Sequence, residues 1–317
     1  MKKIIRFNIY FIFMLAIFFF ASVSPQSKYE KLVENAQEDF MAPVWSPDGS
    51  MIAFTSAKYK GIWIIDLQNR NIKQITDETA AGFLFKWSKD SQSILTRVAK
   101  YDDMRRYNAV KIFNVKAGES FLLTGFRTIM PGLPSFTPDN NKVYMFGKNN
   151  LELFDSGIEA VPDKKSSVSS NIIYLRNDKI AVEDLISHQV ETFEPVKGKR
   201  VLNLQASPDG SRVAFEIYGG DMYVMNTDGT GLTDLGQGYR PKWSSDNQHI
   251  VYMVTKDDGY RILSSDIYTI KIDGTEKTNL TKTADRVEMN PDWSPDGKKI
   301  AFDVPGEGSI YIMNAPQ

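Results

Sequence analysis

Short apolar stretches recur along the chain, and clusters of turn-forming residues separate them. The stretches are rich in isoleucine, valine, phenylalanine and tyrosine. Such short, regularly bounded runs are typical of β-strands, whereas no segment shows the 3.6-residue period of an amphipathic helix. The pattern predicts an all-β fold.

One class of turn has a five-residue motif: an aromatic residue, serine, proline, aspartate and glycine, complete at residues 45–49 and 293–297. The first position is occupied by Trp45, Trp87, Phe136, Ala206, Trp243 and Trp293. The fourth position holds Asp48, Asp90, Asp139, Asp209, Asp246 and Asp296. Proline presets one turn corner and glycine or asparagine accepts the left-handed conformation, so we expect tight hairpins whose aspartates accept backbone N–H bonds. Ser91 departs from this chemistry, and its turn is expected to be looser.

A second signature lies further along each unit: an apolar residue, any residue, two apolar residues, and usually aspartate or asparagine. It starts at Ile62, Val110, Leu151, Ile180, Met222, Ile267 and Ile310, with Ile180 the poorest copy. Four short strands in each unit of about 40 residues are typical of a β-propeller blade.

The number of blades depends on the stretch between Phe136 and Ala206, because the turn motif occurs six times and the second signature seven times. Two compact blades fit this stretch better than one blade with a large insertion. We therefore predict a propeller of four-stranded blades, seven rather than six, in which residues 163–195 form a degenerate blade.

Ring closure is predicted from the two ends of the repeat region. The chain ends at Gln317, directly after a copy of the second signature, so the last blade lacks an outer strand. Residues 31–33 would supply that strand, since Leu32 precedes Trp45 by the same spacing that separates Leu280 from Trp293. Pairing the N-terminal strand with the C-terminal blade removes free strand edges. We expect one propeller domain, residues 28–317.

Residues 1–26 differ in composition from the rest of the chain. Lys2, Lys3 and Arg6 precede an uncharged apolar run at 9–20, and small polar residues follow. This is the pattern of a signal peptide, and it predicts export to the periplasm or the cell surface. The alternative is an uncleaved membrane anchor over residues 7–24.

Charge and cysteine content exclude several functions. The chain has 38 basic and 39 acidic residues, so it lacks the basic excess that binding to a nucleic acid requires. It has no cysteine, which rules out disulfides, thiolate metal sites and a cysteine nucleophile.

The turn at 293–297, the Ile-Ala-Phe strand at 300–302 and the Ile-Tyr-Ile-Met-Asn strand at 310–314 resemble the WD40-like (PD40) repeats of TolB-type propellers. The resemblance covers essentially all of the chain after the first 26 residues. It implies a periplasmic scaffold that contacts a peptidoglycan-associated lipoprotein and the Tol complex. TolB proteins carry an α/β domain before a six-bladed propeller, whereas only some fifteen residues separate the predicted signal peptide from the first blade here, so the repeats alone do not imply a Tol role.

Catalytic chemistry has little support in the sequence. There is no nucleophile elbow, phosphate-binding loop or zinc motif. His188 and His249 lack neighbours at metal-ligand spacing, and the Asp-Gly turns at 228–229 and 273–274 lack the alternating acids of calcium loops. We expect no metal, no cofactor and no enzyme activity. The alternative is a carbohydrate-active or other hydrolytic propeller that uses paired carboxylates.

Binding residues are predicted on two long connections between second and third strands, at 97–108 and 255–266. Tyrosine and arginine often anchor protein contacts, and function concentrates on loops held by a rigid scaffold. The candidates are Tyr101, Asp102, Asp103, Arg105, Arg106, Tyr107, Asp257, Asp258, Tyr260 and Arg261. Arg127, Arg240, Arg286 and Glu288 are expected on the same face, opposite the motif turns.

These features predict an exported, monomeric, non-enzymatic module that binds an envelope protein on this face. A cell-wall saccharide is an alternative ligand. Two other readings remain open: a purely structural subunit of an envelope complex, and hairpins that are merely solvated and bind nothing.

Overall fold

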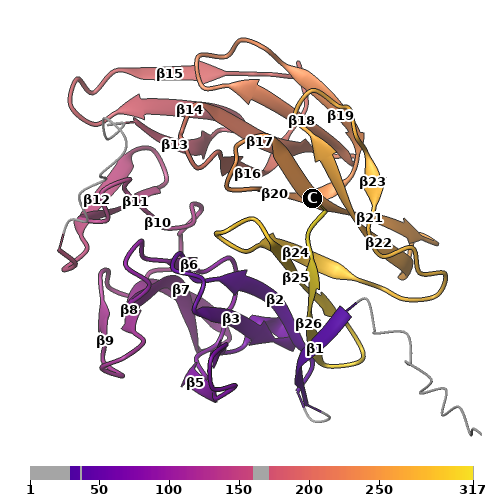
Figure 1. The fold of residues 1–317 in the computed structure, drawn as a ribbon. Helices are drawn as coiled ribbons and strands as arrows, with labels where there is room; N and C mark the ends of the chain where they lie inside the picture. The colour runs from indigo at the N-terminus through magenta and orange to yellow at the C-terminus, as the bar shows by residue number, and fades with distance from the viewer. Residues whose placement is uncertain (1–28, 36–37, 160–170, 317) are drawn as a thin grey trace, which may run out of the picture.

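The computed structural model describes residues 29–35, 38–159 and 171–316, so the predicted signal peptide lies outside the described residues. Seven antiparallel sheets are arranged in a ring (Figure 1). The described residues contain one short helical segment, the 3-10 turn η1 (Ala57–Tyr59). No helix in this part of the chain is long and apolar enough to cross a membrane.

The sheets are numbered here as blades 1 to 7 in chain order, and the strands of each blade are given in their order within the sheet. Blade 1 consists of β2 (Phe40–Trp45), β3 (Met51–Ser56), β4 (Ile62–Asp66) and β5 (Ile72–Thr76). Blade 2 consists of β6 (Lys86–Trp87), β7 (Ser93–Asp102), β8 (Arg105–Asn114) and β9 (Ser120–Leu122). Blade 3 consists of β10 (Ser135–Phe136), β11 (Lys142–Phe146) and β12 (Leu151–Asp155). Blade 4 consists of β13 (Asn171–Arg176), β14 (Lys179–Asp184) and β15 (Val190–Phe193). Blade 5 consists of β16 (Val201–Ala206), β17 (Arg212–Ile217), β18 (Asp221–Asn226) and β19 (Thr233–Gln237). Blade 6 consists of β20 (Tyr239–Trp243), β21 (His249–Asp257), β22 (Ile262–Lys271) and β23 (Thr278–Asn279). Blade 7 consists of β24 (Met289–Trp293), β25 (Lys299–Val304), β26 (Ser309–Asn314) and β1 (Tyr29–Glu34).

The all-β propeller and its seven blades are confirmed, and all seven copies of the second signature form strands. Five blades show the predicted four strands, and the described residues of blades 3 and 4 contribute three strands each. Both blades border residues 160–170, which lie outside the description. The predicted degenerate blade at 163–195 is described from Asn171 onward, as β13, β14 and β15.

The two ends of the described chain meet in blade 7, where β1 pairs antiparallel with β26 (Figure 1). The register places Tyr29 opposite Met313 and Glu34 opposite Ser309. Val33 is buried between blades 7 and 1, with Phe40 and Ile310 in the same cluster. The outer strand of the last blade therefore comes from residues that precede the first blade.

The hydrophobic core lies between neighbouring blades. Seven clusters of buried side chains are found in the described residues, and each spans two adjacent sheets. In one of them, Ile62 and Ile64 of blade 1 pack with Trp87 and Ile94 of blade 2. Side chains that alternate on the two faces of a strand can fill both flanking interfaces, which is why the second and third strands read as almost continuous apolar runs.

The six motif turns share one hydrogen-bond pattern. In the first, the Ser46 hydroxyl donates to Asp48 Oδ1 at 2.7 Å, and the backbone N–H of Ser50 donates to the same oxygen at 3.0 Å. The Ser294 hydroxyl makes the equivalent bond to Asp296 and, together with the Lys298 N–H, holds the pKa of Asp296 below its usual value. The repeated aspartates thus stabilise hairpins.

The turn at Ser91 is as tight as the others, so the expectation of a looser turn is wrong. Ser91 adopts φ +60°, and its N–H bonds to the Ser88 carbonyl at 2.9 Å, the same distance as Gly49 N–H to Ser46. Its hydroxyl accepts the backbone N–H of Asp48 from blade 1 at 3.0 Å. This contact between blades gives the buried Ser91 side chain a role that a glycine could not fill.

Candidate functional site

The first predicted binding hairpin, β7–β8 of blade 2, has an exposed tip. Cross-strand pairing places Tyr101 opposite Arg106 and Asp102 opposite Arg105, while Asp103 and Met104 form the turn with positive φ. Tyr101 is 62% exposed and Met104 is fully exposed. Sequence reasoning overlooked Met104, because a single methionine in a polar loop carries no signal of its own.

The second predicted hairpin, β21–β22 of blade 6, also ends in exposed side chains. Tyr260 is 99% exposed, and the apolar residues Ile262 and Leu263 that follow it are partly exposed as well. Sequence reasoning did not single out Ile262 and Leu263, which the strand pattern alone does not distinguish from buried residues. The two tips therefore present large apolar side chains beside charged ones.

The paired aspartates of the second hairpin are occupied within their own loop. Asp257 Oδ1 accepts the N–H of Gly259 at 2.9 Å. Asp258 Oδ1 accepts the N–H groups of Arg261 and Tyr260, also at 2.9 Å, and these bonds hold the pKa of Asp258 below its usual value. These two carboxylates fix the loop conformation, which leaves Tyr260 and Arg261 as its outward-facing candidates.

Both long hairpins are fixed at the base to the connection that leads into the next blade. Asn108 exchanges two backbone hydrogen bonds with Arg127, at 2.8 and 2.9 Å. Ser265 bonds in the same way to Arg286 and Glu288, at 3.1 and 3.0 Å. The same structural device thus holds each tip on a rigid support.

Three of the four additional residues predicted on this face form ion pairs or hydrogen bonds with other side chains of the fold. Arg127 forms a bidentate ion pair with Glu152, at 3.0 and 2.8 Å, and Arg286 forms one with Glu307, at 3.0 and 3.1 Å. Glu288 is fully buried and accepts the Thr283 hydroxyl at 2.8 Å. No hydrogen bond or ion pair joins the two hairpins within the described residues, since blades 7 and 1 separate them around the ring.

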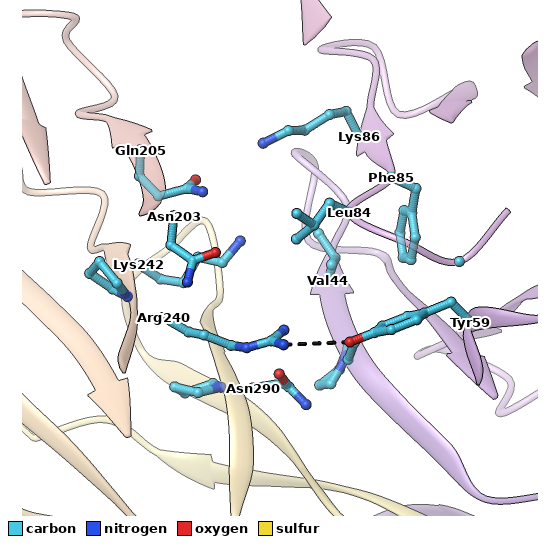
Figure 2. Close-up of a pocket in the computed structure, with 15 residues that line it drawn as sticks. Val44, Tyr59, Leu84, Phe85, Lys86, Asn203, Gln205, Arg240, Lys242 and Asn290 are labelled. Atoms are coloured by element: carbon cyan, nitrogen blue, oxygen red, sulfur yellow. Dashed lines mark hydrogen bonds between the residues drawn. The ribbon is translucent and has the colours of Figure 1, made fainter. Parts of the chain in front are cut away.

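The fourth, Arg240, lines a cavity between the inner strands in the middle of the ring (Figure 2). The cavity leaves about 60 Å³ for the centres of water-sized atoms, which is room for a few waters or one small chemical group. Inner strands begin at the blade-to-blade connections, so the start of β20 places Arg240 toward the face with the long hairpins. Tyr59, in the short connection of blade 1, lies across the cavity with its hydroxyl 3.5 Å from Arg240 Nη2.

The cavity is built from two repeated positions of the inner strands. The residue three positions before the motif anchor has φ between 48° and 56° in five blades, at Ala42, Leu84, Asn203, Arg240 and Asn290. All five line the cavity, as do the residues one position before the anchor at Val44, Lys86, Gln205 and Lys242. In β2, β16, β20 and β24 the strand pairing shifts at this point, so a β-bulge turns the strand toward the channel.

Counting back from the motif anchors would have identified the cavity wall in the sequence. Three of the bulged strands also carry a proline two positions before the anchor, at Pro43, Pro241 and Pro291. The anchors drew attention to the turns that follow them, and the residues before them were overlooked.

Two buried acids accept hydrogen bonds from the residues at the bulges. Asp303 Oδ1 accepts the Asn290 side-chain amide of its own blade at 2.8 Å and the N–H of Ala42 in blade 1 at 2.9 Å. Glu216 repeats the arrangement, accepting the Asn203 amide at 2.8 Å and the backbone N–H of Arg240 in the next blade. Burial raises the pKa of Asp303 to about 7 and also raises that of Glu216.

The cations of the cavity differ in their partners. Lys242 Nζ lies 3.9 Å from Asp292 Oδ1, and the other Asp292 oxygen accepts the N–H of Trp45 at 2.9 Å. The Lys86 ammonium points into the cavity (Figure 2). Within the described part of the chain, it has no hydrogen-bond or ion-pair partner. Burial, followed by repulsion from Lys242, lowers the pKa of Lys86 to about 8.

Metal chemistry has no visible site in residues 29–35, 38–159 and 171–316, where no three His, Asp or Glu side chains converge. His188 is an exposed residue of a strand turn, with φ +57°. His249 Nδ1 lies 2.8 Å from the carboxylate of Asp246, a motif-turn aspartate. His188 therefore lies in a turn, and His249 begins strand β21 beside a motif turn.

Comparison with known proteins relates the chain to TolB. No family model matches it. A TolB homolog from Chlorobium luteolum is 28% identical over 169 residues, which are 50% of this chain and 37% of that protein. The match thus spans little more than a third of the relative's length.

Solved structures show the same fold at low sequence identity. A TolB structure from Agrobacterium tumefaciens has a TM-score of 0.54 and 18% identity, covering 88% of this chain and 91% of that one. The Myceliophteria thermophila Cps50 (Swd1) propeller domain has a TM-score of 0.64 and 9% identity, covering 91% and 100%. An oligogalacturonate lyase in complex with manganese has a TM-score of 0.50 and 12% identity, covering 90% and 79%. The resemblance to TolB-type propellers is confirmed.

Proposed function

We propose that this TolB-like propeller is an exported, non-enzymatic module of the cell envelope that holds a protein partner on the face with hairpins β7–β8 and β21–β22. The observation that carries the proposal is the pair of exposed hairpin tips. Each presents a tyrosine, an arginine and a large aliphatic side chain or methionine, and each is fixed at its base to the following blade. Exposed apolar side chains beside charged ones are typical of protein contact surfaces.

An envelope location is supported by two independent features. The proteins similar to this chain include TolB proteins, and residues 1–26 have the pattern of a signal peptide. The partner's identity stays open in this proposal, which concerns only the surface that meets it.

The test is photo-crosslinking in envelope fractions, with a crosslinker placed at Tyr101 or Tyr260. The same protein band should be trapped from both positions. The quadruple variant with Tyr101, Arg105, Tyr260 and Arg261 replaced by alanine should then capture the band at least tenfold more weakly with an unchanged melting temperature, because all four side chains are exposed.

The matched control is Ile186, which is 82% exposed in a turn on the opposite face. A crosslinker at Ile186 should not trap the band, and Ile186→Ala should leave capture unchanged. Equal capture by the quadruple variant would reject this surface.

The enzymatic alternative needs two carboxylates that are free to react. The acids with raised pKa around the cavity are Asp303, Glu216 and Asp292. Asp303 and Glu216 each already accept two hydrogen bonds from the fold, and Asp292 accepts the N–H of Trp45 and lies next to Lys242. The fold of oligogalacturonate lyase, which this chain shares, makes an acidic oligosaccharide a reasonable substrate to assay. Cleavage that disappears in Glu216→Gln without loss of folding would favour the enzyme over the scaffold.

A further inference from the structure

Lys86 is the anomaly of the central cavity. Lys86 is partly buried, and removing an ammonium even partly from water without giving it a partner is costly. The lowered pKa of Lys86 reflects this burial and the nearby Lys242. The strand β6 nevertheless holds the side chain toward the cavity, and the uncharged Gln205 and Val44 occupy the equivalent position in two other blades.

The other cations of the cavity already have partners. Lys242 lies next to Asp292, whose charge also acts on Lys86. Arg240 contacts the Tyr59 hydroxyl and lies close to the carboxyl groups of Glu216 and Asp303. Among these three cations, Lys86 is therefore the one without a hydrogen-bond or ion-pair partner in the described residues, and an anionic group in the cavity would pair with it.

Two neutral donors line the same cavity as Lys86. The Gln205 side-chain amide points into the cavity that Lys86 also enters (Figure 2), and it has no side-chain hydrogen bond within the described residues. The Tyr59 hydroxyl accepts from Arg240, which leaves its own proton free to donate. The cavity has room for a group of a few heavy atoms.

We propose that the central cavity is a binding site for a carboxylate group, held by Lys86 with Lys242 and Gln205 beside it. The carboxylate belongs either to a small free acid or to an aspartate or glutamate side chain of a bound peptide. This site is separate from the hairpin tips, and the two proposals can fail independently.

The test is calorimetric titration at constant ionic strength with three probes: sodium acetate, the tripeptide acetyl-Gly-Asp-Gly-amide and inorganic phosphate, with sodium chloride as the reference salt. Wild-type protein should bind acetate or the aspartate tripeptide saturably. Binding of acetate indicates a free acid, and binding of the tripeptide alone indicates a peptide side chain. Lys86→Gln should weaken this binding at least tenfold, which corresponds to about 1.4 kcal/mol.

The control is Lys116→Gln, which removes an exposed lysine on the turn after β8 and should leave binding unchanged. Circular dichroism melts check folding, and Lys86→Met gives a second variant without the charge. Tyr101→Ala with Tyr260→Ala should keep full carboxylate binding even where partner capture is lost. Absence of saturable carboxylate binding, tighter binding of phosphate, or equal binding by folded Lys86→Gln protein would each overturn the proposal.

Discussion

The Asp303 carboxylate of blade 7 accepts a hydrogen bond from the backbone N–H of Ala42 in blade 1 at 2.9 Å, across 261 residues of sequence. The same oxygen accepts the Asn290 amide, while Asp303 Oδ2 is buried without a hydrogen-bond partner in the structure. A carboxylate thus joins the first and last blades at the inner end of the seam.

The pKa of Asp303 makes this junction sensitive to pH. The folded value of about 7 lies above the unfolded value of about 4, so the folded state binds the proton more tightly between these limits. The contribution of Asp303 to stability is therefore fully present below about pH 4 and is lost as the pH rises to about 7. Urea unfolding at pH 5 and pH 8 should show wild type losing a few kcal/mol relative to Asp303→Asn, because asparagine does not titrate.

Asp296→Asn is the control for this prediction, because the pH dependence expected for Asp296 has the opposite sign. Hydrogen bonds from Ser294 and Lys298 lower the pKa of Asp296, so its contribution is present at neutral pH and is lost as the pH falls through the acidic range. A difference between wild type and Asp303→Asn that does not change with pH would contradict the assignment for Asp303.

Two motif tryptophans should respond differently to loss of the indole N–H. Trp87 Nε1 donates to the Val44 carbonyl of the neighbouring blade at 3.2 Å, whereas Trp293 Nε1 is buried without a partner in the structure. Trp87→Phe should therefore cost about 1 kcal/mol more of unfolding free energy than Trp293→Phe. Urea unfolding followed by circular dichroism measures both variants, and equal costs would show that the indole bond contributes nothing.

The outer strand of blade 7 should contribute directly to the stability of the ring. Val33 on β1 is 2% exposed and packs between blades 7 and 1. Val33→Ala should lower the unfolding free energy by about 2 kcal/mol through lost packing. Glu34→Ala, which changes an exposed neighbour on the same strand, should change it by less than about 1 kcal/mol. Calorimetric melts of both variants provide the measurement, and similar melting temperatures would indicate that β1 is not essential to the ring.

Ser91 offers a test of the contacts between motif turns. Its buried hydroxyl accepts the Asp48 N–H, so Ser91→Ala leaves that donor without its acceptor and should cost about 1–2 kcal/mol. Ser120→Ala, on the exposed edge strand β9, is the matched control and should be nearly neutral. If chemical denaturation gave both variants the same stability, the contact between these turns would have no energetic weight.

The amino-acid sequence by itself determined the repeat unit of this protein. Turn chemistry and strand alternation act over a few residues, so Trp45, Asp48 and their counterparts define each hairpin wherever the blade lies in the ring. The seven strands of the second signature followed from the same local patterns, and even the degenerate copy at Ile180 formed its strand. Among the motif turns, only the one at Ser91 was predicted wrongly, because the partner of its side chain belongs to another blade.

The tertiary structure alone decided which side chains face one another across the ring. Lys86, Arg240 and Asn290 come from three blades, and no local pattern links them. They meet because closure brings inner strands from distant parts of the chain around one channel, and because bulges at the left-handed positions turn those strands inward. The partners of Arg127 and Arg286, and the burial of Glu288, were likewise decided by neighbouring blades, since hydrogen bonding and desolvation depend on distance in space.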